Sequence, residues 1–343
     1  MSRKKIIYSF LLVLLVVIIW QRPLLYYAFV QAKGQIRVVT DTREVDDILA
    51  DPQAPDSIKI KLKLIQEVKK FAVDSLGINP SDNYTSVFDQ KGKPILWVVT
   101  ACLPFAMEAK EWSFPLVGSF SYKGFFEYDM AVEEEKKWKD QGYDTNIRTT
   151  GGWSTLGWFR DPILSNMLNR KTGDLAELII HELTHGTLFV KDSLQFNENL
   201  ATFIGTKGAE LFLTQKFGAD SQEFSTYIED NEDSKKFSQH ILRGAIGLDS
   251  LYQTFGHTLS DDDKTQRKQT FIEEIFDRID TLSLHRKSDY LEFYKDYEAN
   301  NTFFMSYLRY RKNQGQFEET LQNDFDNNLK NYLLYLKSQY PSL

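Results

Sequence analysis

The run from residue 175 to residue 189 constrains the fold of this chain more than any other stretch. Ala176 and Ile180 begin a series of apolar positions at helical spacing, so the run is predicted to be an α-helix with one buried face. On such a helix His181 and His185 lie one turn apart and project side by side. The chain must therefore fold around a helix that presents two imidazoles together.

The residues between these histidines complete the pattern His-Glu-x-x-His. Two imidazoles so placed can hold one Zn²⁺ at about 2.0–2.1 Å each. Glu182 lies about 100° further round the helix, which suits a general base acting on a zinc-bound water. The alternative is two ordinary helical histidines beside a surface glutamate. Chance would produce only about 0.005 such matches in a chain with five histidines.

A third ligand is predicted in the segment that follows. The helix is expected to run to about Val190, and residues 191–193 offer turn and N-cap chemistry. A helix that starts at Leu194 needs four or five residues to travel back the ~7.5 Å to the level of His185. That distance places Glu198 beside the histidines.

Two alternatives to Glu198 as the third ligand were considered. Glu177 lies one turn before His181, but too far along the axis to complete a tetrahedron with both histidines. In the absence of a metal, Glu198 would instead be an acid stabilised by the dipole at a helix N-terminus. The predicted ligands are therefore His181, His185 and Glu198.

These motifs resemble two groups of metallopeptidases. The Asn-Glu-x-x-Ala pattern that begins at Asn197 resembles the gluzincins, in which its Glu is the third zinc ligand. The 12 residues between His185 and Glu198, with the upstream Trp153-Ser-Thr-Leu-Gly-Trp-Phe159, resemble the bacterial predicted-aminopeptidase family. The resemblance covers about residues 24–320, and it also rests on residues 112–118, 122–124 and 300–301. Trp153 and Arg160 depart from the family, which usually has Tyr at the first position and often an acid at the second.

The resemblance implies a zincin-like α+β fold and a peptide substrate. The peptidase domain would cover residues 31–343. An N-terminal α/β lobe with a small β-sheet, residues 31–165, would be followed by the metal helix and a mostly α-helical lobe, residues 166–343. One Zn²⁺ per chain would be bound, with Glu182 as the general base. A gluzincin also needs a hydrogen-bond donor near the scissile carbonyl, which the family places at Tyr310, with Tyr307 as the alternative.

The N-terminus is predicted to be a signal anchor over residues 1–30. Residues 6–20 are mostly aliphatic with Ser9 as the only polar interruption, basic residues 3–5 precede them, and residues 24–30 can extend the apolar segment. A cleaved signal peptide and a buried helix are the alternatives. The basic flank predicts that the rest of the chain is exported, to the periplasm or the extracytoplasmic face.

Composition and charge limit the other possibilities. The chain contains 42% hydrophobic and 26% charged residues. This composition predicts that the exported part is a large globular domain. The net charge of −7 gives no electrostatic case for binding nucleic acid. Cys102 is the single cysteine, so the chain has no internal disulfide. Cys102 is expected to be a buried apolar residue. The sequence does not indicate an oligomeric state.

Apolar periodicity and turn residues predict most of the other elements. Ser154 to Gly157 could be an edge strand that binds extended peptide or a core strand. Gly205 and Gly208 should allow close packing on the metal helix, and the acids at 261–263 should lie at a helix N-terminus. Expected strands are 94–100, 114–122, 145–149 and 153–158; expected helices are 45–49, 58–76, 130–141, 199–217, 221–230, 235–254, 264–280 and 332–340.

The predicted function is that of a membrane-anchored zinc peptidase. The resemblance suggests an aminopeptidase, but the spacing itself indicates only a hydrolytic zinc site. Two alternatives stay open: an endopeptidase with the same site, and a non-catalytic zinc-binding scaffold of the cell envelope. An aminopeptidase needs an acidic group for the substrate α-amine, and the sequence does not identify one.

Overall fold

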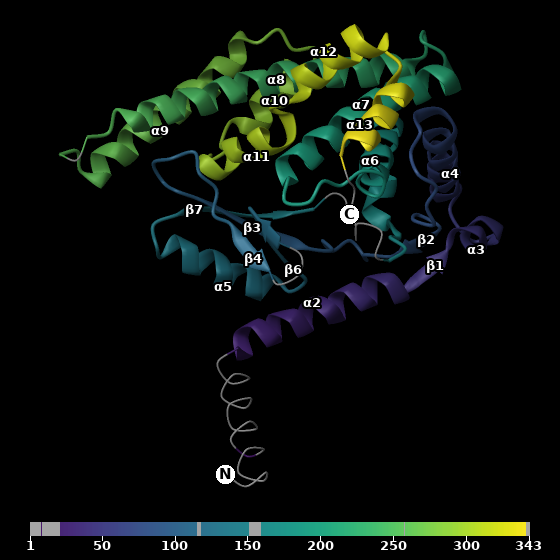
Figure 1. Ribbon diagram of the computed structural model, residues 1–343, viewed down its shortest axis with the longest axis horizontal. Coiled ribbons are helices and arrows are strands. Elements are labelled where there is room, and N and C mark those ends of the chain that lie inside the picture. Colours follow the sequence, from purple (N-terminus) through teal and green to yellow (C-terminus); the bar gives the residue numbers. More distant parts are fainter. Residues whose placement is uncertain (1–7, 9–20, 115–117, 151–158, 257, 341–343) are drawn as a thin grey trace.

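The computed structural model describes residue 8 and residues 21–114, 118–150, 159–256 and 258–340. Over these residues the protein is a mixed α+β fold, mostly helical with small sheets (Figure 1). In this part of the chain no helix has the length and apolar character needed to cross a bilayer. The apolar run at 6–20, apart from Tyr8, lies outside the described residues.

Three helices open the described chain: α2 (Arg22–Thr40), α3 (Val45–Ala50) and α4 (Asp56–Leu76). The two helices predicted at 45–49 and 58–76 are thereby confirmed to within two residues. α4 buries apolar residues at spacings of three and four and ends at Gly77, whose φ of 77° suits glycine. The boundary predicted between residues 30 and 31 falls inside α2.

The central sheet has three antiparallel strands. β3 (Trp97–Cys102) lies between β6 (Lys123–Phe125) and β7 (Asp144–Thr149). α5 (Tyr128–Lys139) covers one face of this sheet, where Val99, Phe125 and Ala131 are buried together. The α5 helix and the β7 strand confirm the elements predicted at 130–141 and 145–149, while β3 begins three residues later than predicted. Cys102 is buried at its end, as expected.

The single strand predicted over 114–122 is wrong. The chain forms a two-stranded hairpin there, with β4 (Trp112–Phe114) antiparallel to β5 (Gly118–Phe120). Phe114 pairs with Gly118, so the chain reverses between them. Gly118 has a φ of 89°, which an L side chain rarely adopts. The residues predicted as one strand therefore include parts of two strands.

A third sheet leads the chain into α6, the helix that carries His181 and His185. β2 (Ser86–Phe88) pairs with β1 (Thr42–Glu44) in antiparallel and with β8 (Ile163–Leu164) in parallel orientation. A short 3-10 helix at Ser165–Asn169 follows β8, and α6 begins at Thr172. Strands of two or three residues carry too little alternation to be seen in a sequence, and none of the three was predicted.

Helices make up the rest of the described chain, and they form the upper part of the molecule in Figure 1. The acids at 261–263 do lie at a helix N-terminus, capped by Ser260. The closing helix predicted at 332–340 is also present. The helices are α6 (Thr172–His185), α7 (Leu194–Phe217), α8 (Gln222–Gln253), α9 (Asp261–Asp277), α10 (Lys287–Tyr294), α11 (Asn301–Arg311), α12 (Gln314–Phe325) and α13 (Leu329–Gln339).

The helical ranges expected at 221–230 and 235–254 form one continuous helix, α8. Asp233 lies between the two ranges and is fully buried, because its carboxylate accepts the backbone N–H groups of His285 and Arg286 at 2.7 and 2.8 Å. A buried polar residue with partners in another segment can stay inside a helix.

α6 and α7 pack closely because α7 carries glycines where they meet. A Cβ at Gly205 would lie 2.9 Å from the carbonyl oxygen of Glu177 and 3.2 Å from Cβ of His181. A Cβ at Gly208 would lie 3.0 Å from Ile180, also on α6. Any side chain would push the helices apart. The close packing predicted from the two glycines is confirmed.

Gly205→Ala should lower the free energy of unfolding by about 1–3 kcal/mol, the usual cost of overpacking. Gly315→Ala is the matched control, because nothing lies within 4 Å of a Cβ there. That change should leave stability unchanged or raise it by up to about 1 kcal/mol. Urea denaturation of both variants makes the comparison. Equal stability of the two would contradict the close approach at Gly205.

Candidate metal centre

α6 ends at His185, five residues before the predicted end at Val190. The hydroxyls of Thr184 and Thr187 donate to backbone carbonyls one turn earlier, at 2.8 and 2.9 Å. Such side-chain bonds compete with the helix ladder, and Gly186 follows the last helical residue. The second histidine therefore lies in the last turn of its helix.

Asn197 fixes the connection between α6 and α7. Its side-chain oxygen accepts the N–H of Val190 at 2.8 Å, and its amide donates to the carbonyl of the same residue at 2.7 Å. Asp192 takes a φ of 56° in the turn, and α7 begins at Leu194, as predicted. The residue before Glu198 therefore sets the position at which α7 returns along α6.

The three predicted ligands meet. Oε2 of Glu198 lies 3.5 Å from Nε2 of His181 and 3.6 Å from Nε2 of His185, and the two nitrogens are 3.2 Å apart. Tetrahedral zinc with bonds of about 2.0–2.1 Å holds its ligands about 3.3–3.4 Å apart. The triangle therefore has the size that a tetrahedral ion requires. Among the described residues no other set of three His, Cys, Asp or Glu side chains comes together in this way.

The charges of this cluster compensate one another. Burial raises the pKa of Glu198, but the rings of His185 and His181 outweigh it and hold the pKa well below its usual range. Burial disfavours the charged form of His185, yet the carboxylate of Glu198 raises its pKa overall. Glu198 is consequently an anion, the form in which a carboxylate binds a cation.

Glu182 is buried beside the cluster without belonging to it. Burial raises its pKa, and Glu198 and Asp161 raise it further, against the opposing effect of His181 and His185. A carboxylate with a raised pKa accepts a proton more readily near neutral pH. The arrangement can therefore hold a cation and a proton acceptor side by side.

Tyr84 and Asp161 also lie near Glu182, and no sequence pattern predicted either of them. Tyr84 is 1% exposed with a φ of 62°, and among the described residues its hydroxyl has no hydrogen-bond partner. Burial, Glu182 and Asp161 raise the pKa of Tyr84 well above its usual value, so it stays a neutral donor. Asn83 and Asp161 hold this loop by reciprocal bonds of 3.2 and 3.0 Å. No motif connects residues so far apart in the chain.

A match to a family model identifies the chain at the level of its family. The model described as "Putative aminopeptidase" matches residues 26–338. The chain belongs to this family. No curated protein and no solved structure matches it. Membership in the aminopeptidase family implies a peptidase, a hydrolase that acts on peptide substrates.

Glu177 takes no part in the metal cluster of this aminopeptidase-family protein. Its carboxylate accepts the hydroxyl of Thr206 at 3.1 Å and that of Tyr227 at 2.6 Å. These bonds tie α6 to α7 and α8. Among the described residues Glu177 is not part of the cluster of His181, His185 and Glu198.

Of the two tyrosines predicted as carbonyl donors, Tyr307 is engaged elsewhere. Its ring packs against Phe237 and Phe303, and its hydroxyl bonds with Tyr294. Tyr310 lies in α11, and its side chain is outside what the structure describes. The edge strand predicted at 154–157 also lies outside the described residues, and both stay predictions.

Hydrogen bonds connect α11 both to α7, which carries Glu198, and to the β-sheet that contains β3 and β7. The amide of Asn199, the residue after Glu198, donates to the carbonyl of Arg309. At the other end of α11, the side chain of Asn300 donates to the carbonyl of Thr145 at 3.0 Å, and Asn301 donates to that of Leu103 at 2.9 Å. The backbone of residue 310 is therefore held near the turn of α7 that contains Glu198.

The remaining histidines in the described chain have structural partners. His240 lies 2.7 Å from the carbonyl of Ile275, and His285 lies 3.0 Å from Glu232. His257 lies outside the described residues. His240 and His285 therefore both interact with protein groups outside the cluster of His181, His185 and Glu198.

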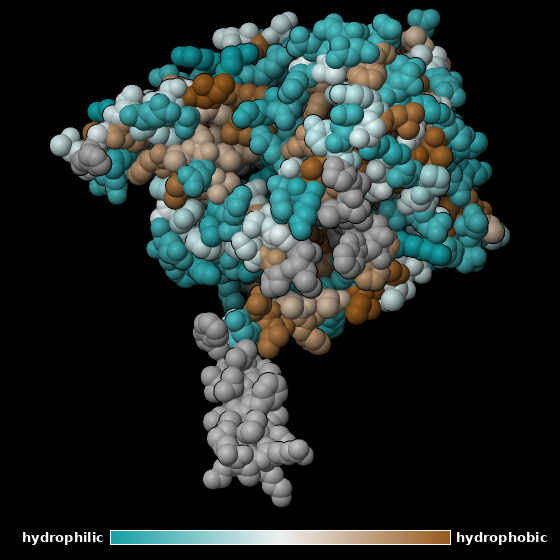
Figure 2. All heavy atoms as spheres, in the orientation of Figure 1, coloured by the Kyte–Doolittle hydropathy of each residue, from teal (hydrophilic) through white to brown (hydrophobic). Residues whose placement is uncertain are grey.

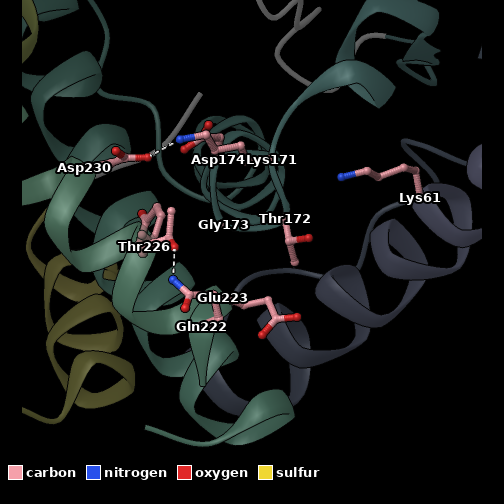
Figure 3. A pocket seen from close by; sticks show the side chains of 10 residues that line it. Lys61, Lys171, Thr172, Gly173, Asp174, Gln222, Glu223, Thr226 and Asp230 are labelled. Atoms are coloured by element: carbon pink, nitrogen blue, oxygen red, sulfur yellow. Dashed lines mark hydrogen bonds and ion pairs between the residues drawn. The ribbon is translucent and has the colours of Figure 1, made fainter. Parts of the chain in front are cut away.

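The pocket in Figure 3 is separate from the metal cluster. It lies at the N-terminus of α6, with Thr172 in its lining, which is about 20 Å along the helix from His185. Its cations are already bonded: Lys171 contacts Asp230 at 2.6 Å, and Lys61 donates to the carbonyl of Arg170 at 2.6 Å. The pocket therefore has no evident part in the chemistry of the cluster.

Replacing Glu198 with Gln should weaken the binding of Zn²⁺ by more than about 100-fold, because loss of a group that only hydrogen-bonds to a ligand already costs about 10–100-fold. Glu177→Gln is the matched control, since Glu177 lies on the neighbouring helix and bonds only protein groups. Chelator competition with the purified protein measures both affinities. Equal zinc affinity in the two variants would remove Glu198 from the ligand set.

Proposed function

We propose that the protein is a zinc-dependent peptidase, anchored in a membrane by its N-terminal segment, that removes residues from the N-terminus of peptides. His181, His185 and Glu198 would bind one Zn²⁺, as in gluzincins. The single observation that carries this proposal is the triangle of 3.2, 3.5 and 3.6 Å between their ligand atoms. When bound there, zinc supplies a Lewis acid that activates water and polarises a carbonyl.

Glu182 would move the proton during hydrolysis. Water attacks the scissile carbonyl carbon, and the carboxylate of Glu182 takes the proton that the water releases. The carbon–nitrogen bond then breaks, and Glu182 passes that proton to the leaving amine. The raised pKa of Glu182 suits both halves of this transfer. Tyr84 adds a neutral hydroxyl beside the base, and Tyr310 stays the predicted donor to the carbonyl.

The surroundings of Glu182 favour catalysis over a non-catalytic zinc scaffold. Burial of a carboxylate next to two other acids is unfavourable. A scaffold would need only the three ligands and would gain nothing from this fourth group. Groups with strongly perturbed pKa values cluster at functional sites.

Glu182→Gln keeps the size of the side chain and removes its basicity. We expect kcat/KM on a peptide substrate to fall about 10²–10⁴-fold, with zinc content and folding unchanged. Metal analysis and circular dichroism of the same preparation provide the control. A variant that cleaves peptides at near the wild-type rate would exclude Glu182 as the general base.

The exopeptidase part of the proposal rests on the family and has its own test. A peptide with a free α-amine should be cleaved at its first bond. The same peptide with an acetylated N-terminus should react at least about 100-fold more slowly. Acetylation removes the charge of the α-amine, so the acidic group that would bind this amine is left buried without a partner, at a cost of several kcal/mol. Mass spectrometry of the products identifies the bond. Equal cleavage of both at internal bonds would instead establish the endopeptidase alternative.

The topology follows from the basic residues 3–5 and the apolar run at 6–20. A reporter that is active only outside the cytoplasm, fused after residue 343, should be active in cells. A reporter that requires the cytoplasm, at the same position, should be silent and is the matched control. The reverse pattern would place the peptidase domain in the cytoplasm and contradict the anchor.

A further inference from the structure

α2 exposes an apolar stripe on the face that points away from the protein. Leu25, Phe29 and Ile36 are 49, 65 and 60% exposed, and with exposed Ala32 they repeat at intervals of four, three and four residues. That spacing keeps all of them on one side of a helix. Three large apolar side chains in water on one helix face are unfavourable and mark a binding surface.

The opposite face of α2 is held firmly, so the stripe cannot turn inward. The hydroxyl of Tyr27 donates to the carbonyl of Gly124 at 2.9 Å, and its ring packs edge-on against Phe125 at 5.4 Å. Gly34 lies directly against the ring of Phe126. Figure 1 shows α2 along the lower edge of the molecule, and Figure 2 shows hydrophobic side chains gathered at that edge.

The charge of α2 is opposite to that of the whole chain. The helix contains Arg22, Lys33 and Arg37, all exposed, and no acidic residue. The chain as a whole has a net charge of −7. At 100° per residue the three cations follow one border of the stripe. A helix with an apolar face bordered by Lys and Arg is typical of helices that lie in the interface of an anionic bilayer.

We propose that α2 binds an anionic lipid surface, with Leu25, Phe29 and Ile36 inserted among the acyl chains and its three cations at the headgroups. The apolar run at 6–20 ends one residue before the N-cap of α2, so the same end of the domain carries both features. A second copy of the chain fits less well. The stripe contains four apolar residues, whereas each partner in a stable interface contributes about 20–30 residues. Its basic border would also face that of the other copy.

Lipid insertion of α2 can be measured on the full chain with a fluorophore at Ile36→Cys. The matched control is Ile246→Cys on α8, which is 65% exposed and lies on the opposite side of the molecule in Figure 1. Cys102 is buried, and burial raises its pKa to about 12, so it should not be labelled. Each protein is mixed with phosphatidylcholine vesicles that contain or lack phosphatidylglycerol, with a spin-labelled lipid as the quencher.

In phosphatidylglycerol vesicles the lipid should quench the label at position 36 at least about twofold more than the label at 246. The difference should shrink without the anionic lipid or after Arg22, Lys33 and Arg37 are changed to Gln. Equal quenching at the two positions would overturn the proposal. A second result would also overturn it: without vesicles, the label at position 36 becomes less accessible to the aqueous quencher iodide as the protein concentration rises. A second copy of the chain would then cover the stripe. Neither result depends on zinc or on peptidase activity.

Discussion

The close approach of α6 and α7 is the contact on which the candidate site depends. A helix pair separated by ordinary side chains would carry Glu198 away from the histidines. Gly205 removes the side chain at the point of contact, 2.9 Å from the backbone of α6, and Asn197 fixes the turn on both sides of Val190. The ligand triangle is therefore a product of helix packing.

The same packing explains how so many charged groups can be buried together. Glu198 is stabilised as an anion by two imidazoles, while Glu182 has no such excess of positive neighbours and its pKa is raised. Under the proposed function, these two carboxylates on adjoining helices would have separate roles, Glu198 as a ligand and Glu182 as a base. Environments that push the pKa values of neighbouring acids apart are the usual basis of such a division.

The clustering of the three proposed ligands could be predicted from the sequence because the position of each depends on local geometry. His181 and His185 follow from helical periodicity, and Glu198 follows from the length of a turn. The early end of α6 could not be predicted, because it depends on hydroxyls that bond backward to the backbone. The hairpin at Gly118 was missed because the whole range 114–122 was taken as one strand. Tyr84 and Asp161 reach Glu182 only through the assembly of β2 and β8, which are too short to leave a pattern.

The central claim is that one zinc ion is bound where α6 and α7 meet, and anomalous diffraction at the zinc edge from crystals of the full chain tests it most directly. One strong peak per chain should lie about 2.0–2.1 Å from Nε2 of His181, Nε2 of His185 and an Oε of Glu198. A zinc peak elsewhere, or no peak between these three side chains in crystals grown with zinc, would contradict it.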